Sequence, residues 1–301
     1  MDFKPLLPNH FSSILEYFKT HNFNLCVYSP ASIIVWNNFI SSPYFLEKDN
    51  TLFISNIFHK KAEKSHLIMP LSINKEISPS FLYESAVNFG FKDYWFIPEE
   101  YIENNKEIED LFIIKEQKDY EDYIYKSENL SLLKGKKFSK KRNLLNQFTT
   151  NYINKKRVIV ENINDSNMNE CLIFLEKWFN DKNFDKADED FITEKIAAET
   201  AIRNFKILNF DSVIIRIDGK IEGYTMGSRL NNDSWVLHFE KASSDIKGLY
   251  QFLDRETAIN VSKNFTYINK ESDMGVEGIA HSKKSYFPDK RSKSYQLTLK
   301  N

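Results

Sequence analysis

The sequence predicts an α/β protein with mixed sheets that is divided into two domains. Its 301 residues, 42% of them hydrophobic, exceed one ordinary small domain and can fill two cores. Helical and strand-like hydrophobic patterns alternate along the chain, most regularly in the second half. Because 15% of the residues are aromatic and only eight are Gly and eight Pro, we expect a globular chain.

Composition also indicates the cellular compartment and excludes some classes of protein. Cys26 and Cys171 form no CxxC pair, which suits a reducing compartment and gives no zinc framework. Residues 1–10 lack the basic start and apolar core of a signal peptide. The longest uncharged run, 22–46, contains Asn, Ser and two prolines, which is untypical of a membrane span. We therefore expect a cytoplasmic protein without a transmembrane segment or a metal site.

The first third is predicted to form one α/β unit. Hydrophobic residues at helical spacing predict a helix at 11–18. The other elements expected there are strands at 44–58 and 64–71, a helix at 80–88, and strands at 91–97 and 111–114. The polar, charged segment 115–129 is expected to be a linker.

A strongly basic segment follows, with the sequence LLKGKKFSKKRNLLNQF at 132–148. Six of the nine residues at 134–142 are Lys or Arg, and residues 127–157 carry nine bases and one acid, a local +8 in a chain of net charge -1. The apolar residues fall on one helical face, which predicts a basic connecting helix at 131–156. Cations at a helix start are unfavourable unless an anion or solvent screens them. The segment therefore either holds a phosphate-bearing partner or is a solvated charge run.

The second half has a regular order of elements. We expect a strand at 157–161, helices at 168–179 and 191–205, strands at 207–217, 221–229 and 235–242, a helix at 249–262, a strand at 265–269, a helix at 276–286 and a last strand at 294–299. Turns at 218–219 and 231–233 separate the three central strands.

This order resembles the GNAT acyltransferase fold, and five short segments sharpen the likeness. GKKFSKKRNLLNQF (135–148), HFEKA (238–242), KGLYQ (247–251), INKESDMGVEG (268–278) and KKSYFP (283–288) resemble the pattern of the lysylphosphatidylglycerol synthase C-terminal domain family. The resemblance implies two GNAT-like domains in tandem: a degenerate one at 1–130 and a second at 157–301, joined by the basic helix at 131–156. All five segments lie after residue 130, so the second domain is expected to carry the chemistry.

For the lipid-modifying relatives, the resemblance implies transfer of an amino acid from an aminoacyl-tRNA to a lipid head group. Those relatives carry a large membrane portion with no counterpart in this sequence. We therefore expect an acyl or aminoacyl transferase that either visits an anionic lipid surface or uses another amine or hydroxyl acceptor. Two alternatives stay open: a CoA-dependent N-acyltransferase, and a non-catalytic module that binds an anionic ligand or a polyamine.

HFEKA contains the expected catalytic base. Strand alternation sends His238 and Glu240 to one face of the sheet and their neighbours Leu237 and Phe239 to the other. The resemblance implies that Glu240 takes the proton of an attacking amine or hydroxyl, which requires a pKa raised by burial. His238 is then a candidate substrate contact. The alternative is a strand-end Glu240 paired with Lys241 or another cation.

KGLYQ occupies the place of the phosphate-binding loop of acetyl-CoA users, whose pattern is Q/R-x-x-G-x-G/A. Only Gly248 matches that pattern. Asp245 stands in place of the Gln or Arg and Tyr250 in place of a small residue, so the segment disfavours CoA and we expect no cofactor. An ordinary strand-to-helix turn also explains Gly248, and Tyr250 becomes a candidate substrate contact.

INKESDMGVEG is expected to form an acidic pocket. Asn269 and Glu271 lie on one face of the expected strand, and Asp273 lies in the loop beyond it. This strand should lie beside HFEKA in a GNAT-like sheet, so we expect these side chains and Glu240 to share one pocket for a cationic group, such as a lysyl moiety or a polyamine. Asp273 alternatively caps the following helix, and the segment does not match a calcium loop.

The remaining candidates are anion-binding residues. Lys283 and Tyr286 match the family pattern K-x-S-Y-x-P, which implies that they bind a phosphate or carboxylate of the donor, although the helix dipole alone accounts for cations there. Lys140, Lys141 and Arg142 are expected to hold a phosphate-bearing partner, an aminoacyl-tRNA or an anionic lipid surface. The sequence contains no GxSxG, HExxH, GxGxxG or G-x-x-x-x-G-K-[ST] motif, so the corresponding hydrolase, protease and nucleotide sites are unsupported.

Overall fold

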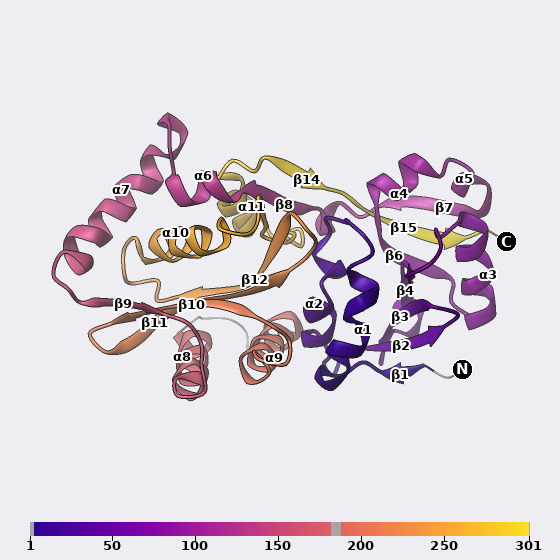
Figure 1. The fold of residues 1–301 in the computed structure, drawn as a ribbon, viewed down its shortest axis with the longest axis horizontal. Helices are drawn as coiled ribbons and strands as arrows, with labels where there is room; N and C mark the ends of the chain where they lie inside the picture. Colours follow the sequence, from indigo (N-terminus) through magenta and orange to yellow (C-terminus); the bar gives the residue numbers. More distant parts are fainter. Residues whose placement is uncertain (1–2, 182–187, 301) are drawn as a thin grey trace.

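The computed structural model describes residues 3–181 and 188–300, which form two mixed sheets lying side by side (Figure 1). The strands of the first sheet are β1 (Lys4–Pro5), β2 (Ser41–Lys48), β3 (Thr51–Phe58), β4 (His66–Ile68), β5 (Leu71–Ser72), β6 (Asp93–Pro98), β7 (Phe112–Glu116) and β15 (Ser294–Leu299). Those of the second sheet are β8 (Asp122–Lys126), β9 (Val158–Glu161), β10 (Asp211–Ile217), β11 (Lys220–Arg229), β12 (Ser234–Ala242), β13 (Tyr267–Asn269) and β14 (Lys290–Ser292).

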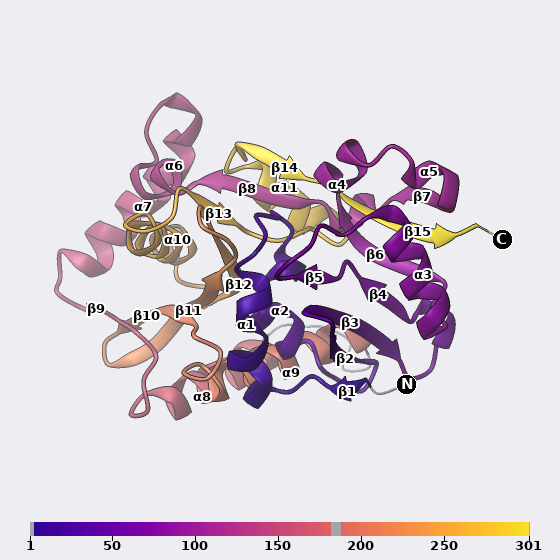
Figure 2. The ribbon, with the colours of Figure 1, turned by 45° about the vertical axis from the view of Figure 1, so that its right-hand side comes forward.

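Helices cover both sheets, and α1, α2 and α9 lie between them (Figures 1 and 2). The α-helices are α1 (Phe11–Phe18), α2 (Pro30–Val35), α3 (Pro79–Phe89), α4 (Glu99–Asn104), α5 (Ile108–Leu111), α6 (Ser127–Leu132), α7 (Ser139–Phe148), α8 (Met168–Asp181), α9 (Glu189–Arg203), α10 (Leu249–Val261) and α11 (Glu277–Lys284). The elements expected in the second half are therefore confirmed, with ends that shift by a few residues.

Each sheet contains one parallel pair in an otherwise antiparallel arrangement. In the first sheet β4 runs parallel to β6, and in the second β12 runs parallel to β13. Both parallel pairs are short, with two and three residue pairs respectively. The prediction of a mixed α/β fold is confirmed, and the repetition of this feature indicates that the two halves share one plan.

The two sheets exchange strands. β8 lies between β13 and β14 of the second sheet, and β15 lies between β6 and β7 of the first. The sheets therefore do not follow the expected division at 130 and 157, because β8 precedes that division and β15 follows it. The first and last strands of the chain, β1 and β15, consequently both lie in the first sheet (Figure 1).

The expected linker at 115–129 is wrong, because it contains β8 and the start of α6. Tyr123, Ile124 and Tyr125 are all buried. Both tyrosine hydroxyls donate hydrogen bonds, to Asp273 and to the carbonyl of Lys283. A short strand that is buried on both faces shows no alternation of polar and apolar residues in its sequence. Because this strand carries tyrosines in place of aliphatic residues, its sequence also looks polar.

The expected strand at 44–58 is a hairpin of β2 and β3. Its turn residues, Asp49 and Asn50, have φ of 51° and 56°. Two successive left-handed residues are typical of the type I′ turn, which matches the twist of the flanking strands and favours Asn and Asp.

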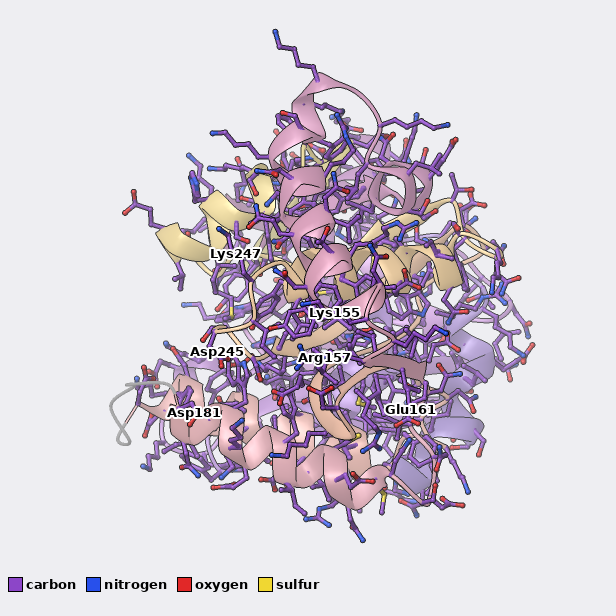
Figure 3. All side chains as sticks on the ribbon, turned by 90° about the vertical axis from the view of Figure 1, so that its left-hand side faces the viewer. Lys155, Arg157, Glu161, Asp181, Asp245 and Lys247 are labelled. Carbon is purple, nitrogen blue, oxygen red and sulfur yellow. The ribbon has the colours of Figure 1, made fainter. Side chains whose placement is uncertain are left out.

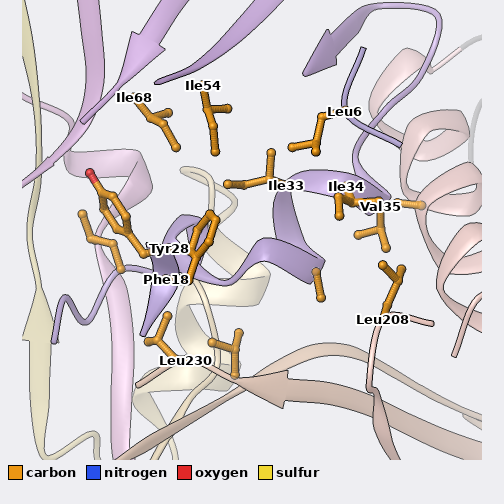
Figure 4. Packing of buried hydrophobic residues seen from close by; sticks show 14 of the residues in the cluster. Leu6, Phe18, Tyr28, Ile33, Ile34, Val35, Ile54, Ile68, Leu208 and Leu230 are labelled. Carbon is orange, nitrogen blue, oxygen red and sulfur yellow. The ribbon is translucent and has the colours of Figure 1, made fainter. Parts of the chain in front are cut away.

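Two hydrophobic cores lie on opposite faces of the second sheet. One extends from the first sheet through α1 and α2 to α8 and α9, and Figure 4 shows residues of both halves in this cluster, with Val35 of α2 next to Leu208 of the second half. The other lies under α6, α7 and α10 and includes Trp235, which is 1% exposed. The face to which a β12 side chain points therefore decides whether it lies against the first half or against α10.

Candidate functional site

Glu240 lies where β12 and β13 separate. The two strands pair only from Ser234 to Val236, and Glu240 lies four residues beyond that stretch. Glu240 is opposite Thr225 on β11, and Thr225 hydrogen-bonds Thr257 of α10. The Glu240 side chain therefore faces α10 rather than the first half of the chain.

Lys270 fills the space between the separating strands. Its Nζ lies 3.1 Å from Oε2 of Glu240 and also forms an ion pair with Asp254 of α10. The side chains of Lys270, Glu240 and Asp254 are only 11%, 17% and 7% exposed. One lysine thus balances two buried carboxylates.

Burial makes Glu240 a carboxyl that titrates near neutrality. It raises the pKa of Glu240 to about 7, with a further rise from the charge of Asp254 and an opposing effect from Lys270. Burial acts to lower the pKa of Lys270, but Asp254 and Glu240 outweigh it and raise that pKa above its ordinary value. The lysine therefore stays charged, while Glu240 can take or release a proton at physiological pH.

Two tyrosines and a second lysine complete this cluster. The buried ring of Tyr286 lies 3.8 Å from Nζ of Lys141 and 5.2 Å from Nζ of Lys270. The Tyr286 hydroxyl has no hydrogen-bond partner of good geometry in the described part of the chain, and burial, followed by the charge of Asp254, raises its pKa. Burial, followed by the charge of Glu240, also raises the pKa of Tyr250. The structure thus brings together four predicted site residues: Lys141, Glu240, Tyr250 and Tyr286.

Lys270 and Asp254 are the members of the cluster that the sequence analysis missed. Alternation along INKES provides a signal, since it places Lys270 on the same face as Ile268, which is buried under α10. Asp254 lies just after the first turn of α10. The sequence does not show which face of that helix packs against the sheet, so it does not show that Asp254 is buried.

The prediction that His238 and Glu240 share a face is wrong, because β12 contains a bulge. Phe239 is opposite Met226 and Leu237 is opposite Gly227, so His238 is an extra residue in the ladder. A bulge reverses the alternation beyond it. Leu237 and Glu240 therefore face α10, while His238 and Phe239 face the first half.

His238 joins a second polar network, which links the two halves. Its Nδ1 lies 2.9 Å from Oε1 of Glu271, and its Nε2 lies 2.8 Å from Oγ of Ser228. Ser228 in turn lies 2.8 Å from Ser29, at the start of α2. Glu271 thus points away from Glu240, and the expected single pocket is divided between the two faces of the sheet.

Asn269 also bonds to the first half. Its amide donates to the carbonyl of Asn24 at 2.7 Å and to the carboxylate of Asp122 at 2.8 Å. The backbone N–H of Cys26 donates to the same carboxylate at 2.6 Å. Burial raises the pKa of Asp122 to about 6 despite these bonds. Asn269 therefore holds the halves together rather than facing an open pocket.

Asp273 and Lys283 shape the loop after β13. Asp273 accepts hydrogen bonds from the Tyr123 hydroxyl and from the N–H of Gly275. Nζ of Lys283 donates to the carbonyls of three successive residues, 270–272. Burial, partly offset by Glu271, lowers the pKa of Lys283. Both side chains thus have partners within the protein.

The predicted anion-binding bases of α7 differ in their surroundings. Lys140 is exposed, whereas Lys141 is half-buried and donates to Oγ of Ser285 at 2.8 Å. Arg142 donates to the carbonyls of Leu133 at 2.5 Å and of Gly135 at 2.7 Å. Arg142 therefore fixes the turn between α6 and α7.

Gly248 has a structural explanation. It has a φ of 85°, and a Cβ there would lie 2.2 Å from the carbonyl oxygen of Leu144 in α7. Only glycine allows α7 to approach the start of α10 this closely. Figure 3 shows Asp245 and Lys247 on the loop before α10, with Asp181 of α8 nearby. The acidic Asp245 and the packing of α7 both disfavour a pyrophosphate at this turn.

A cavity of about 720 Å³ lies in the first half, between the β2–β3 turn and α3. Glu47, Lys75 and Phe81 are among its lining residues, and no site residue predicted from the sequence lines it. It is therefore separate from the Glu240 cluster.

Comparison with known families identifies the chain. The family described as "Phosphatidylglycerol lysyltransferase, C-terminal" matches residues 97–298, which is more than half of the sequence. The chain belongs to this family.

Among curated proteins, this phosphatidylglycerol lysyltransferase C-terminal family member is similar to an uncharacterised protein of Mycoplasmoides gallisepticum. The two are 24% identical over 177 residues, which cover 59% of this chain and 56% of the other. The chain thus spans little more than half the length of that relative.

Three solved structures show the fold of the family member. A conserved protein of unknown function from Bacteroides thetaiotaomicron is 27% identical with a TM-score of 0.89, covering 100% of both chains. The C-terminal domain of a lysylphosphatidylglycerol synthetase from Agrobacterium fabrum is 13% identical with a TM-score of 0.63, covering 98% of this chain and 92% of that one. A tandem GNAT protein from the clavulanic acid biosynthesis pathway is 7% identical with a TM-score of 0.50, covering 100% and 99%. The expected tandem GNAT-like fold is confirmed.

Within residues 3–181 and 188–300, no helix combines the length and the apolar composition needed to cross a bilayer.

Proposed function

We propose that this protein transfers an aminoacyl group from aminoacyl-tRNA to an amine or hydroxyl acceptor, with Glu240 as general base. Family and fold indicate a lysylphosphatidylglycerol synthetase-like, GNAT-type acyltransferase. The observation that carries the choice of base is the pKa of about 7 that burial gives Glu240 where β12 and β13 separate. A donor of this kind also favours a cytoplasmic location.

The acceptor nitrogen or oxygen forms a bond to the ester carbonyl carbon of the donor while its proton passes to the Glu240 carboxylate. The ester C–O bond to the tRNA ribose then breaks, and the ribose oxygen leaves as a hydroxyl after taking up a proton. A base with a pKa near the working pH suits both proton transfers. Lys270 would hold Glu240 in place, since it also binds Asp254.

The contacts of the other predicted site residues indicate the role of each in the proposed reaction. We assign substrate contact to Tyr250 and Tyr286, because burial raises the pKa of both hydroxyls and Glu240 is close enough for its charge to raise it further. Asn269, Asp273 and Lys283 use their polar atoms within the protein, so we assign them to positioning of the loop after β13. For the acceptor we favour the hydroxyl of an anionic lipid head group, because the family description names phosphatidylglycerol.

A transfer assay tests this proposal. The protein is incubated with a tRNA pool charged with labelled amino acids, or with labelled acyl-CoAs, in the presence of phosphatidylglycerol vesicles or small amines. We expect label to move from tRNA and Glu240→Gln to slow the transfer by about 100-fold or more. Glu256→Gln is the matched control, since Glu256 is a half-buried carboxylate of α10 that pairs with Arg255.

Two results would contradict the proposal. Transfer from acyl-CoA and not from tRNA would replace the donor and favour a CoA-dependent N-acyltransferase. Equal rates for Glu240→Gln and the wild type would remove Glu240 as the base.

A further inference from the structure

The turn between α6 and α7 forms an exposed basic tip at an outer corner of the molecule (Figure 1). Lys134, Lys136, Lys137 and Lys140 all have exposed side chains there. In the described part of the chain, none of the four forms an ion pair with a carboxylate, whereas many other lysines do. Their charge is therefore available to an external partner.

Packing and hydrogen bonds hold the backbone of this basic tip in one conformation. Leu133 and Phe138 are 2% and 0% exposed, and they anchor the two ends of the turn in the core under α10. The Arg142 side chain donates hydrogen bonds to the backbone carbonyls of Leu133 and Gly135, which lie in the same turn. The backbone is thus held while the four lysines point outward, which lowers the entropy lost when they bind a partner.

Two exposed apolar side chains flank the lysines. Leu132 is 44% exposed and Phe287 is 42% exposed. Phe287 lies beside the turn, since its ring centroid is 5.6 Å from that of Phe138 and 5.4 Å from Nζ of Lys137.

The backbone at Phe287 is unusual as well. Phe287 follows α11 with a φ of 55°, a position where helix ends favour Gly or Asn and where a bulky residue is uncommon. The edge contact with Phe138 covers only part of the ring, which stays 42% exposed. A ligand at this position would cover the exposed part of the ring.

We propose that this tip is a docking surface for an anionic lipid bilayer. The four lysines would lie at the negatively charged head groups, and Leu132 and Phe287 would enter the interface between head groups and acyl chains. An exposed aliphatic side chain beside lysines favours a bilayer over a nucleic acid, because a phosphate backbone offers it no apolar surface. This docking does not depend on the proposed transfer reaction, and it would bring the protein to a lipid acceptor.

Vesicle flotation tests the docking surface in the absence of any donor. The full chain is mixed with phosphatidylcholine vesicles, with or without an equal share of phosphatidylglycerol. We expect binding only to the vesicles that contain phosphatidylglycerol, and weaker binding at high salt because the charges are then screened. Glu240→Gln should bind as the wild type does, which separates this result from the transfer assay.

Two matched sets of variants locate the surface. Glutamine at the four tip lysines should weaken binding by at least about tenfold. Glutamine at Lys61, Lys64, Lys106 and Lys220, which are exposed elsewhere, changes the net charge equally and should leave binding unchanged. Phe287→Ser should weaken binding to vesicles but not to uncharged tRNA, whereas Phe39→Ser, at a residue 44% exposed in the first half, should affect neither. Thermal unfolding of each variant checks that it is folded.

Three outcomes would overturn the proposal. The first is that the wild type does not bind the phosphatidylglycerol vesicles. The second is that both sets of lysine variants lose binding equally, which would indicate net charge alone. The third is that the tip lysines are needed for tRNA binding but not for vesicle binding, which would assign the surface to RNA.

Discussion

Nζ of Lys270 lies 3.1 Å from Oε2 of Glu240, and the two residues come from strands that are no longer paired at that point. The lysine thereby joins the separating ends of β12 and β13 through side chains instead of through the backbone. Its second carboxylate partner, Asp254, extends the connection to α10. This relationship makes the cluster both a structural joint and the candidate site of proton transfer.

Removal of the lysine should destabilise the protein. Lys270→Met leaves two buried carboxylates without a cation, and we expect the free energy of unfolding to fall by about 3 kcal/mol at pH 8. Urea unfolding measures this change. Lys263→Met, at an exposed lysine, serves as the control and should stay within about 0.5 kcal/mol of the wild type. If Lys270→Met lowers the free energy of unfolding no more than Lys263→Met does, the ion pairs of Lys270 do not stabilise the protein.

The raised pKa of Glu240 predicts a pH dependence of stability. Between about pH 4.5 and 7 the folded state still holds the Glu240 proton, whereas the unfolded state, with a pKa of 4.5, has released it. The folded state binds more protons in this range, so the contribution of Glu240 to stability falls as pH rises and levels off above pH 7. The difference between the wild type and Glu240→Gln in urea unfolding, measured from pH 4 to 8, isolates this contribution. A difference that does not change with pH would contradict the raised pKa.

Two glycines allow a matched test of the contact between α7 and α10. Gly248 and Gly135 have similar φ values of 85° and 87°, but a Cβ at Gly248 meets the Leu144 carbonyl, whereas at Gly135 it meets nothing within 4 Å. Gly135→Ala should cost only the backbone strain, about 1 kcal/mol, and Gly248→Ala about 3 kcal/mol because α7 must also move. Thermal or urea unfolding compares the two variants. Equal losses would argue that the packing of α7 at this turn is loose.

Asn269 should stabilise the junction of the two halves in a pH-dependent way. Asn269→Ala leaves the buried Asp122 carboxylate and the Asn24 carbonyl without its amide donor, which should cost about 2 kcal/mol. The hydrogen bond from Asn269 lowers the pKa of Asp122, so its loss raises that pKa further above about 6. The protonated Asp122 needs the amide less, and the destabilisation should be larger at pH 8 than at pH 5.

Urea unfolding at the two pH values measures the effect of Asn269→Ala, with the exposed Asn264→Ala as the control. Equal losses for Asn269→Ala at pH 5 and pH 8 would separate Asn269 from the ionisation of Asp122.

The sequence was informative wherever hydrophobic spacing alone sets the structure. The helical stripe of α8 and the three strands β10, β11 and β12 were predicted because each buries one face or runs between clear turns. The segments that resembled the family also marked the residues of the cluster, including Glu240 and Tyr286.

The sequence failed where pairing between distant segments decides the outcome. β8 resembles a linker in the sequence, because its tyrosines and Asp122 look polar until their partners across the sheet are known. The pairing of β15 with β6 and β7 likewise leaves no local trace.

The order of elements, the basic segment and the family pattern were determined by the sequence itself, because side-chain spacing and composition act within one segment. The tertiary structure alone decided that the bulge at His238 turns Glu240 away from Glu271, and that Lys270 meets Glu240 and Asp254. A bulge is a mismatch between two strands, and a buried ion pair depends on side chains from separate elements. Neither has a signature in the spacing of a single chain segment, so both appear only when the sheet is assembled.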